Sequence, residues 1–421
     1  MTVSNQSSRL SRMSLWQHRD FRRLWAGDTL SQFGAAIGQF AVPALAVTQL
    51  AATPFEVGVL SAAETAAFLL VGLPAGVWVD RLRRRPLMLR ADLGRFLLLA
   101  TIPAAWWLHV LTVVQLIVVA LLVGLLTVFF DVAYQSYLPS LVGREHIVEG
   151  NAKLQVSQSA AQVSGPALAG LLVQAIGAAT SVLSTSLGFL ASALFLLRIR
   201  SDEPEPVRTE RRDMRADIAE GLRFVLHQPT LRAITFCTGT SNLFSAVSGA
   251  ATLLFLIRQL GVSTGIAGLV MTASGVGAFI GSFTATRWSR RFGQARIIWL
   301  SMLVSGPFAL LMPLTQTGWA LSLFAVAGLG FGFGAVVYNV AQVSYRQAIC
   351  PDRLLGRMNA SVRFIVWGTI PIGGLIGGAL AAWLTPRGAL WVGSVGEMLA
   401  VVWLLASPLR TMRDLPTSQA V

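Results

Sequence analysis

Three carboxyl groups lie inside long apolar runs, where an ionisable side chain is rare enough to indicate chemistry. Glu64 lies deep within its run, and Asp28 and Asp131 lie nearer to the ends of theirs. A carboxylate at the centre of a membrane helix costs roughly 2.5–3.5 kcal/mol on insertion scales, so it is expected to have a function or a charged partner. A carboxyl group can take up a proton in one environment and release it in another. These three residues are therefore candidates for proton coupling, with structural pairing to arginines as the alternative.

Two of the apolar runs also carry polar side chains at the spacing of a helix face. Because polar groups that face lipid are costly, these faces are expected to point into a cavity or against another helix. The residues predicted to line an internal pathway are Ser31, Gln32, Gln39, Thr238, Asn242 and Ser245 from these two runs, and Asn339 from a later run.

The composition indicates that these side chains act from within a membrane. Of the 421 residues, 54% are hydrophobic and 12% are charged, whereas soluble domains are roughly 25% charged. The formal net charge of +14 does not favour a nucleic-acid partner, because the chain offers no long soluble stretch to carry a basic surface. Cys237 and Cys350 show no spacing typical of a disulfide framework or a metal site, so we expect neither metal nor cofactor.

Twelve apolar runs are long enough to cross a bilayer core of about 30 Å as helices. They cover approximately residues 24–48, 57–79, 87–108, 113–136, 154–177, 180–198, 231–257, 265–286, 297–315, 319–341, 359–384 and 390–408. The first residues are polar and basic and lack the pattern of a cleavable signal peptide. The predicted fold class is an all-α membrane protein with twelve transmembrane helices.

The arginines between the runs predict how the chain is oriented. Short cytoplasmic loops carry an excess of Lys and Arg. With the N-terminus inside, the group Arg81 to Arg85 and nearly all other loop arginines fall inside, and only Arg258 and Arg387 fall outside. An even number of spans returns the C-terminus to the same side. We therefore predict a multi-pass protein of the cell membrane with both termini cytoplasmic.

The two halves of the chain resemble each other at an offset of about 208 residues. "DVAYQSYLPSLVGREHIVEGNA" from Asp131 pairs with "NVAQVSYRQAICPDRLLGRMNA" from Asn339, and Ser31-Gln32 pairs with Ser241-Asn242 at a similar offset. Two six-helix units related in this way predict a binding site at their interface and alternating access by rocking, as in transporters. The predicted domains are a bundle over residues 1–197, a cytoplasmic linker over 198–229 and a second bundle over 230–421.

Local patterns predict two further features. In the linker, Ile218, Leu222 and Val225 recur at helical spacing, which predicts a helix that lies on the membrane surface. The run "GLGFGFG" (328–334) lies within an apolar span, so its glycines indicate close helix packing and not a phosphate-binding loop.

Four stretches resemble motifs of the major facilitator superfamily, and the likeness covers nearly the whole chain. "GVWVDRLRRRP" resembles the signature between its second and third helices, and "SGPALAG" is similar to the Gly-Pro motif of its antiporter families. "FFDVAYQSYLPSLV" and "IAEGLRFVLHQPTLR" resemble the drug:proton antiporter branch that includes macrolide efflux proteins and the enterobactin exporter. The matching residues are Gly76, Asp80, Arg81, Arg84 and Arg85 in the first motif, and Gly165, Pro166 and Gly170 in the second.

The resemblance implies a monomeric exporter of a small hydrophobic or amphipathic compound, driven by protons and surrounded by membrane lipids. It also implies that Asp80 and its arginines form a conformational latch that stabilises the outward-open state, and that no cofactor is needed. Import or facilitated diffusion of a small metabolite is the alternative among carriers, because the sequence does not display the direction of transport.

Other function classes fit the sequence less well. Lys153, the only lysine, lacks the glycine spacing of a phosphate-binding loop, so the chain is not expected to hydrolyse ATP. The four histidines lie outside the spans and no HExxH or nucleophile elbow is present, which disfavours a membrane-embedded enzyme. A membrane sensor that does not transport would share this composition.

Overall fold

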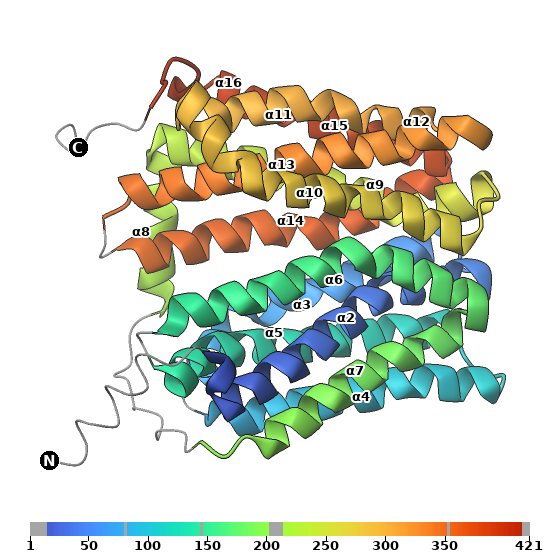
Figure 1. The fold of residues 1–421 in the computed structure, drawn as a ribbon. Coiled ribbons are helices and arrows are strands. Elements are labelled where there is room, and N and C mark those ends of the chain that lie inside the picture. Colours follow the sequence, from blue (N-terminus) through green and yellow to red (C-terminus); the bar gives the residue numbers. More distant parts are fainter. Residues whose placement is uncertain (1–14, 80–81, 144–145, 202–213, 352–353, 415–421) are drawn as a thin grey trace, which may run out of the picture.

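The computed structural model describes residues 15–79, 82–143, 146–201, 214–351 and 354–414, and within these ranges it contains helices and no β-strand. The N-terminal half forms one bundle and the C-terminal half a second bundle beside it (Figure 1). The first bundle consists of α2 (Arg19–Thr48), α3 (Pro54–Val79), α4 (Arg84–Trp107), α5 (Val113–Val142), α6 (Ile147–Ile176) and α7 (Ala178–Arg198), preceded by η1 (Leu15–Gln17). The second consists of α9 (Pro229–Leu253), η3 (Leu254–Gln259), α10 (Thr264–Phe292), α11 (Arg296–Ala309), α12 (Leu311–Leu314), η4 (Gly318–Leu321), α13 (Ser322–Ile349), α14 (Leu355–Trp383), α15 (Pro386–Leu399), α16 (Val402–Leu405) and η6 (Pro408–Arg410).

Both ends of the described chain lie at one end of the molecule, here named the terminal end. The backbone N–H of Leu15 donates to Glu149 at the start of α6 (3.3 Å), and that of Gln294 donates to Asp414 (3.2 Å). The linker helix α8 (Met214–His227) lies at this end too (Figure 1). The other end of the molecule, which carries the loops 49–53, 260–263 and 384–385, is the opposite end.

The twelve predicted spans are all present as helices. In the described residues, eleven are apolar and long enough to cross a membrane by length and composition. The remaining span is α4, a helix of 24 residues that carries several charged side chains. Two of them, Asp92 and Arg95, are 0% and 3% exposed and form an ion pair inside the bundle. Two of the charges that make α4 look unlike a membrane helix are therefore hidden from lipid, whereas Arg90 nearer the terminal end is exposed.

Several helices extend further toward the terminal end than the sequence predicts. The fourth span was expected to end at residue 136 and the tenth at 341, whereas α5 continues to Val142 and α13 to Ile349. At the start of the fifth span, α6 begins at Ile147 in place of 154. Hydropathy marks where lipid contact ends, but the backbone hydrogen bonds of a helix continue through polar residues beyond that point.

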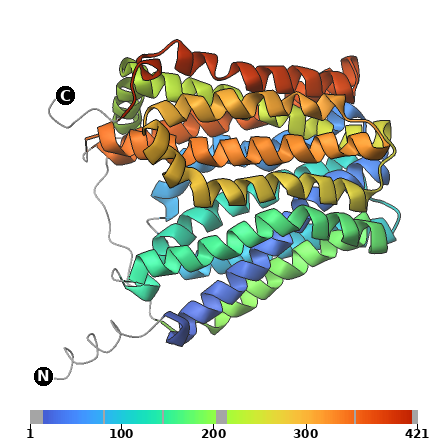
Figure 2. The same ribbon diagram turned by 45° about the horizontal axis from the view of Figure 1, so that its top comes forward.

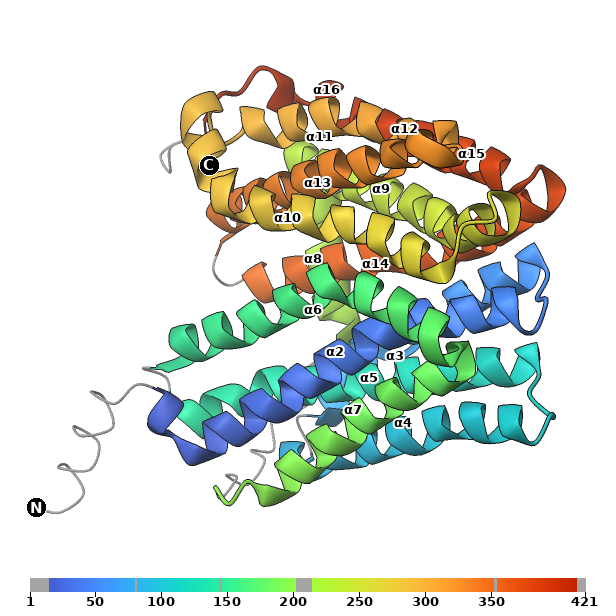
Figure 3. The same ribbon diagram turned by 45° about the vertical axis from the view of Figure 1, so that its right-hand side comes forward.

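Two helix pairs join the halves. In the first pair, α3 meets α14 at Gly58 and Gly378, where a Cβ built on Gly58 would lie only 2.5 Å from the Cα of Gly378. In the second pair, α6 meets α10, where the backbone of Gly268 lies against the Pro166 carbonyl. Because α3 and α10 are the second helices of their halves and α6 and α14 the fifth, the two contacts are equivalent. The pseudo-symmetry expected from the repeat is confirmed, and the pairing is visible in Figures 2 and 3.

The halves are also connected by hydrogen bonds at the opposite end. Arg258 on η3, a π-helical turn that continues α9, donates to the Val47 carbonyl (2.7 and 3.1 Å) and to the Ala52 carbonyl (2.6 Å). The backbone N–H of Gly265 donates to the side chain of Gln174 (3.1 Å). A cation at the C-terminal end of α2 is favoured by the helix dipole. These bonds and the two glycine contacts hold the opposite end closed.

The helix predicted in the linker is present, but it does not present its whole apolar face to lipid. Val225 on α8 is completely buried and packs in one cluster with Leu231 at the start of α9 and with Met358 and Val362 on α14. Glu220 forms an ion pair with Arg357 of α14. The position of α8 at the membrane surface stays a prediction, and the structure adds that α14 extends far enough toward the terminal end to receive part of its apolar face.

The glycine-rich run within α13 serves helix packing, as predicted. Gly332 lies against Ser274 of α10, and Gly334 lies against Ser305 of α11. The absence of side chains at these positions lets α13 approach two neighbours at once.

Candidate functional site

Asp28 lies on the face of α2 that points into the N-terminal bundle. One face of α2 packs against α7 through Gly27, Gly34 and Gly38. A different face carries Asp28 and Gln32, which are four residues apart. The Asp28 side chain is 5% exposed and is flanked by Gln32 and by Tyr134 of α5. Asp28 therefore faces protein within the first bundle.

Asp131 on α5 belongs to the same group of side chains. Its negative charge repels that of Asp28, so a proton on either carboxyl group removes the repulsion. The Asp131 side chain is exposed, although it lies within a membrane-spanning helix, and it is within electrostatic range of Arg95 and of Arg363 on α14. Asp131 is therefore accessible and faces a cation of the other half.

The pair Asp92–Arg95 forms the buried floor of this group. The Arg95 guanidinium bonds to the Asp92 carboxylate and lies between two rings, 4.3 Å from the centroid of Phe130 and 4.2 Å from that of Phe189. A local ion pair was the structural interpretation of these two residues from the sequence, and it is confirmed. Because Arg95 is already paired with Asp92, Asp131 and Asp28 are not its direct ion-pair partners in the described residues.

Glu64 lies apart from this group, on α3. It shares a helix face with Val57, Leu60 and Phe68, of which Val57 and Leu60 are 3% and 0% exposed, so its side chain also points inward. The side chain is partly buried, and among the described residues no hydrogen bond or ion pair to it is present. A partly buried carboxyl group with no partner in the described part of the chain matches the behaviour expected of a proton carrier better than that of a structural ion.

The C-terminal half contributes a cation next to Phe68, which lies one helical turn from Glu64 on α3. Arg363 of α14 is exposed and its guanidinium lies 5.1 Å from the ring centroid of Phe68 and 4.6 Å from that of Trp367. Phe68 and Trp367 also contact each other, with centroids 4.8 Å apart, so this cluster spans the two halves. The sequence indicated Arg363 as an intramembrane charge but gave no signal for the two aromatic rings, since apolar residues in apolar runs do not stand out.

The predicted pathway residues of the C-terminal half take different positions. The Thr238 hydroxyl is hydrogen-bonded to Tyr338 of α13 (2.7 Å), and Asn242 donates to the Val366 carbonyl of α14 (3.0 Å). Ser245, on the same side of α9, is exposed, and so is Asn339, whose side-chain oxygen accepts from Gln342 (2.9 Å). Ser245 and Asn339 are thus open to a ligand, while Thr238 and Asn242 also connect helices.

The pathway residues predicted on α2 divide in the same way. Gln39 is exposed and Gln32 lies beside Asp28. Ser31 is 6% exposed and shares the helix face of Gly27 and Gly34, which packs against α7. Ser31 therefore lies in the contact between α2 and α7 and not on the face that carries Asp28 and Gln32. A shift of one residue along a helix is enough to change the face.

Comparison with known proteins identifies this arrangement. The family model for transmembrane secretion effectors, within the major facilitator superfamily, matches residues 10–420. The chain belongs to this family. The fold of this secretion-effector family member is also that of solved transporters: nucleoside transporter NupG (TM-score 0.76, 12% identity, covering 92% of this chain and 99% of that one) and a bacterial homologue of the iron transporter ferroportin in an inward-facing state (TM-score 0.73, 17% identity, 92% and 98%).

The similarity to curated relatives, which are named as transporters, covers most of the length of each chain. It is 27% identical to the enterobactin exporter EntS of Escherichia coli O81 over 98% of both chains, and 26% identical to the multidrug efflux pump Tap of Mycolicibacterium fortuitum over 80% of this chain and 83% of that one. It is 25% identical to the uncharacterized transporter YfiS of Bacillus subtilis, over 93% and 94%. The chain is therefore a membrane transporter of this superfamily and not an enzyme.

The predicted Gly-Pro motif on α6 contacts both halves. Gly165 faces Ala36 of α2, at a place where an added Cβ would lie 2.5 Å from the Ala36 Cβ, and Gly170 faces the Thr264 carbonyl of α10 at the same distance. The Pro166 carbonyl lies against Gly268 of α10. Pro166 and Gly170 thus meet the second half, while Gly165 packs within the first.

The predicted latch is only partly within the described residues. Asp80 and Arg81 lie outside them, and Gly76 lies in the last turns of α3. Arg85 donates to the Leu196 carbonyl (3.0 Å) and to the Leu197 carbonyl (2.9 Å) at the C-terminal end of α7. Arg84 is partly buried at the start of α4. Arg85 therefore has a role within the N-terminal bundle that the sequence did not reveal, because its partners are backbone atoms 111 and 112 residues away.

Proposed function

We propose that this transporter exports a small hydrophobic or amphipathic compound, such as a drug, a siderophore or another secondary metabolite, in exchange for protons. The observation that carries the proposal is the set of carboxyl groups on three helices of one half, Glu64, Asp28 and Asp131, with Asp131 in electrostatic range of Arg363 on the other half. The names of the relatives Tap and EntS, an efflux pump and an exporter, support export.

The charge balance between Asp131 and Arg363 offers a physical basis for coupling. An ionised Asp131 attracts Arg363 and draws α5 and α14 together, whereas a proton on Asp131 removes that attraction. A proton taken up in one facing state and released in the other would therefore change the balance between the two states. Glu64, next to Phe68 on the inward face of α3, and Asp28, next to Tyr134, are the alternative carriers.

The closed opposite end supports an inward-facing assignment for this conformation. The contacts Gly58–Gly378, Gly268–Pro166 and Arg258–Val47 all lie toward that end. Asp131 and Arg363, nearer the terminal end, are exposed. In the same proposal, the latch around Asp80 forms when the terminal end closes, and it then stabilises the outward-open state.

The orientation proposed is one with both termini in the cytoplasm. At the terminal end, arginines begin α2 and α4 and end α10, whereas Arg258 and Arg387 lie at the opposite end, where Arg387 donates to the Thr315 carbonyl (3.1 Å). To test it, Arg83→Cys and Arg387→Cys are made separately in a background without Cys237 and Cys350. An impermeant thiol reagent on intact cells should label only the second, and labelling of the first would reverse the topology.

One experiment separates proton-driven export from facilitated diffusion and from a sensor that does not transport. The purified transporter is reconstituted into liposomes, and uptake of ethidium, an amphipathic cation, and of enterobactin is followed with and without an acidic lumen. Accumulation that needs the acidic lumen and stops on addition of a protonophore is the expected result. Flux that does not depend on the gradient would indicate a facilitator. No counterflow of any compound in a wider screen would indicate a sensor.

A further inference from the structure

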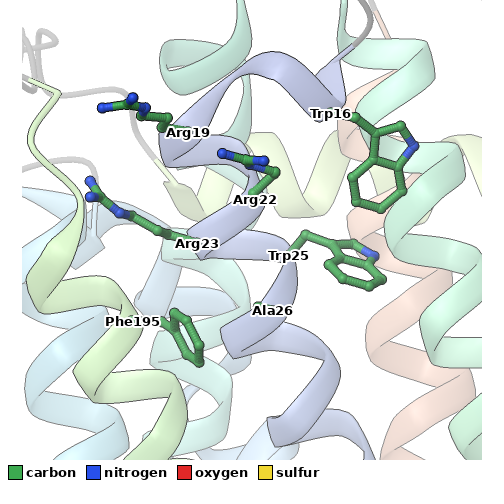
Figure 4. A pocket seen from close by; sticks show the side chains of 7 residues that line it. All are labelled: Trp16, Arg19, Arg22, Arg23, Trp25, Ala26 and Phe195. Carbon is green, nitrogen blue, oxygen red and sulfur yellow. The ribbon is translucent and has the colours of Figure 1, made fainter.

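A basic hollow lies at the terminal end of α2, away from the carboxyl groups described above. It has a volume of about 510 Å³. Figure 4 shows arginine side chains along one border and two tryptophans along another, with Phe195 of α7 below them. The residues that line it are Trp16, Arg19, Arg22, Arg23, Trp25, Ala26 and Phe195.

The hollow opens on an exposed side of α2. One side of the helix carries residues at steps of three or four along the chain, namely Arg19, Arg22 or Arg23, Ala26 and Leu30. Leu30 is 46% exposed and continues this side toward the middle of the membrane. Asp28 and Gln32 lie on a different face, so the hollow does not communicate with the carboxyl groups through α2.

Two of the three arginines of the hollow have no acidic partner within the described part of the chain. The side chains of Arg19 and Arg22 are exposed and form no ion pair or hydrogen bond with another described residue. Arg23 is held by Asp20 (2.7 Å) and by the Arg198 carbonyl (2.6 Å). Among the described residues that line the hollow, Arg19 and Arg22 therefore keep two positive charges available for an anion.

The aromatic side of the hollow is rigid. Trp16 and Trp25 meet edge to face with their centroids 4.9 Å apart, and the Lys153 ammonium lies 4.3 Å from the Trp16 ring. Leu15 is tied to α6 through Glu149, so the tryptophans are fixed between α2 and α6. Tryptophan is enriched at the level of lipid headgroups, where one part of the ring is apolar and the other polar.

We propose that this hollow binds an anionic phospholipid, with the headgroup phosphate on Arg19 and Arg22 and an acyl chain along Ala26, Leu30 and Phe195. Guanidinium groups bind phosphate oxygens in pairs, and basic pockets between membrane helices are suited to anionic headgroups. The apolar floor distinguishes the hollow from a site for free phosphate, because only a lipid has a chain to cover it. A bound lipid would fix the start of α2 against α7.

The test uses the full chain in nanodiscs of phosphatidylcholine with and without phosphatidylglycerol, with bound lipid counted by native mass spectrometry. Arg19→Gln/Arg22→Gln is compared with Arg290→Gln/Arg291→Gln, which removes the same charge from exposed arginines of α10 at the same end. With about 1 kcal/mol expected per basic residue, the first variant should retain phosphatidylglycerol on the order of 30-fold less well, and the control should bind like the wild type. If the double variant does not fold, each single variant is measured, with a smaller loss expected.

Two outcomes would overturn the proposal. Equal retention in the wild type and in Arg19→Gln/Arg22→Gln would exclude the site, and equal losses in both double variants would show that only the total surface charge matters. Competition by soluble glycerophosphoglycerol in the discs that contain phosphatidylglycerol separates a site for a free phosphate ligand from a site for a lipid. The proposed lipid site predicts that the soluble headgroup does not displace phosphatidylglycerol.

Discussion

The two halves of the transporter share a scaffold but differ in the chemistry placed on it. Asp131 in the first half corresponds to Asn339 in the second, and Asp28 corresponds to Thr238. The second half keeps one deeply buried carboxyl group, Glu397, which accepts a hydrogen bond from Ser241 and has no cation in contact among the described residues. Duplication preserved the helix packing, whereas most of the described carboxyl groups inside the spans lie in the first half.

The contacts between the halves show the opposite trend. The pairs α3–α14 and α6–α10 are equivalent, and both depend on glycines at the crossing. A rocking motion needs both pairs, so the mechanical parts stay symmetric, while a proton site is needed only once. The comparison therefore predicts that substitutions at the contacts act alike in both halves and that neutralised acids act mainly in the first.

The largest expected effect is on the stability of the first half. Arg95→Gln leaves the Asp92 carboxylate buried without its partner, which is expected to cost about 3–5 kcal/mol of unfolding free energy. The double variant Asp92→Asn/Arg95→Gln removes both charges and should recover part of the loss. Unfolding in mixed micelles measures both. Unchanged stability of Arg95→Gln would show that the pair does not support the bundle.

A smaller effect is expected at the contact between the halves. Gly58→Ala forces a methyl group against Gly378 and should disfavour the closed opposite end by about 1–3 kcal/mol. Gly249→Ala is the matched control, because a Cβ there meets nothing within 4 Å. Thiol labelling of a Ser61→Cys reporter on α3 should rise in the first variant only. Equal labelling in both would contradict tight packing at this crossing.

The smallest effect is expected at the latch. Asp80→Asn keeps the size of the side chain and removes its charge, so it should slow transport by a few fold, because the predicted latch needs a carboxylate to face its arginines. The rate in proteoliposomes is normalised to the amount of inserted protein. A normal rate at a normal level of protein would exclude the latch role.

The fold could be predicted from the sequence because lipid imposes a simple rule on each span. Apolar length located all twelve helices, and the repeat indicated how the halves are related. The rule does not apply beyond the lipid, so α5 and α13 extend further than predicted. For the same reason the sequence did not reveal that Val225 of α8 packs against the extended part of α14.

The candidate site was predictable where charge itself is the signal. Asp28, Asp131 and Glu64 were found because carboxyl groups in apolar runs are rare, and the structure places all three on inward or accessible faces. Ser31 differs from Gln32 only by one step around the helix, and hydropathy does not resolve that step. The rings of Phe68 and Trp367 around Arg363 depend on contacts between halves that sequence spacing does not encode.

The central claim is that a carboxyl group of the first half carries the coupled proton. The most direct measurement is substrate-induced proton movement in proteoliposomes of the wild type, Glu64→Gln, Asp28→Asn and Asp131→Asn, with substrate exchange measured in the absence of a gradient. At least one variant is predicted to lose proton movement and gradient-driven transport while it keeps exchange. Glu397→Gln, which alters the buried acid of the second half, should keep both. Full proton coupling in all three variants of the first half would contradict the claim.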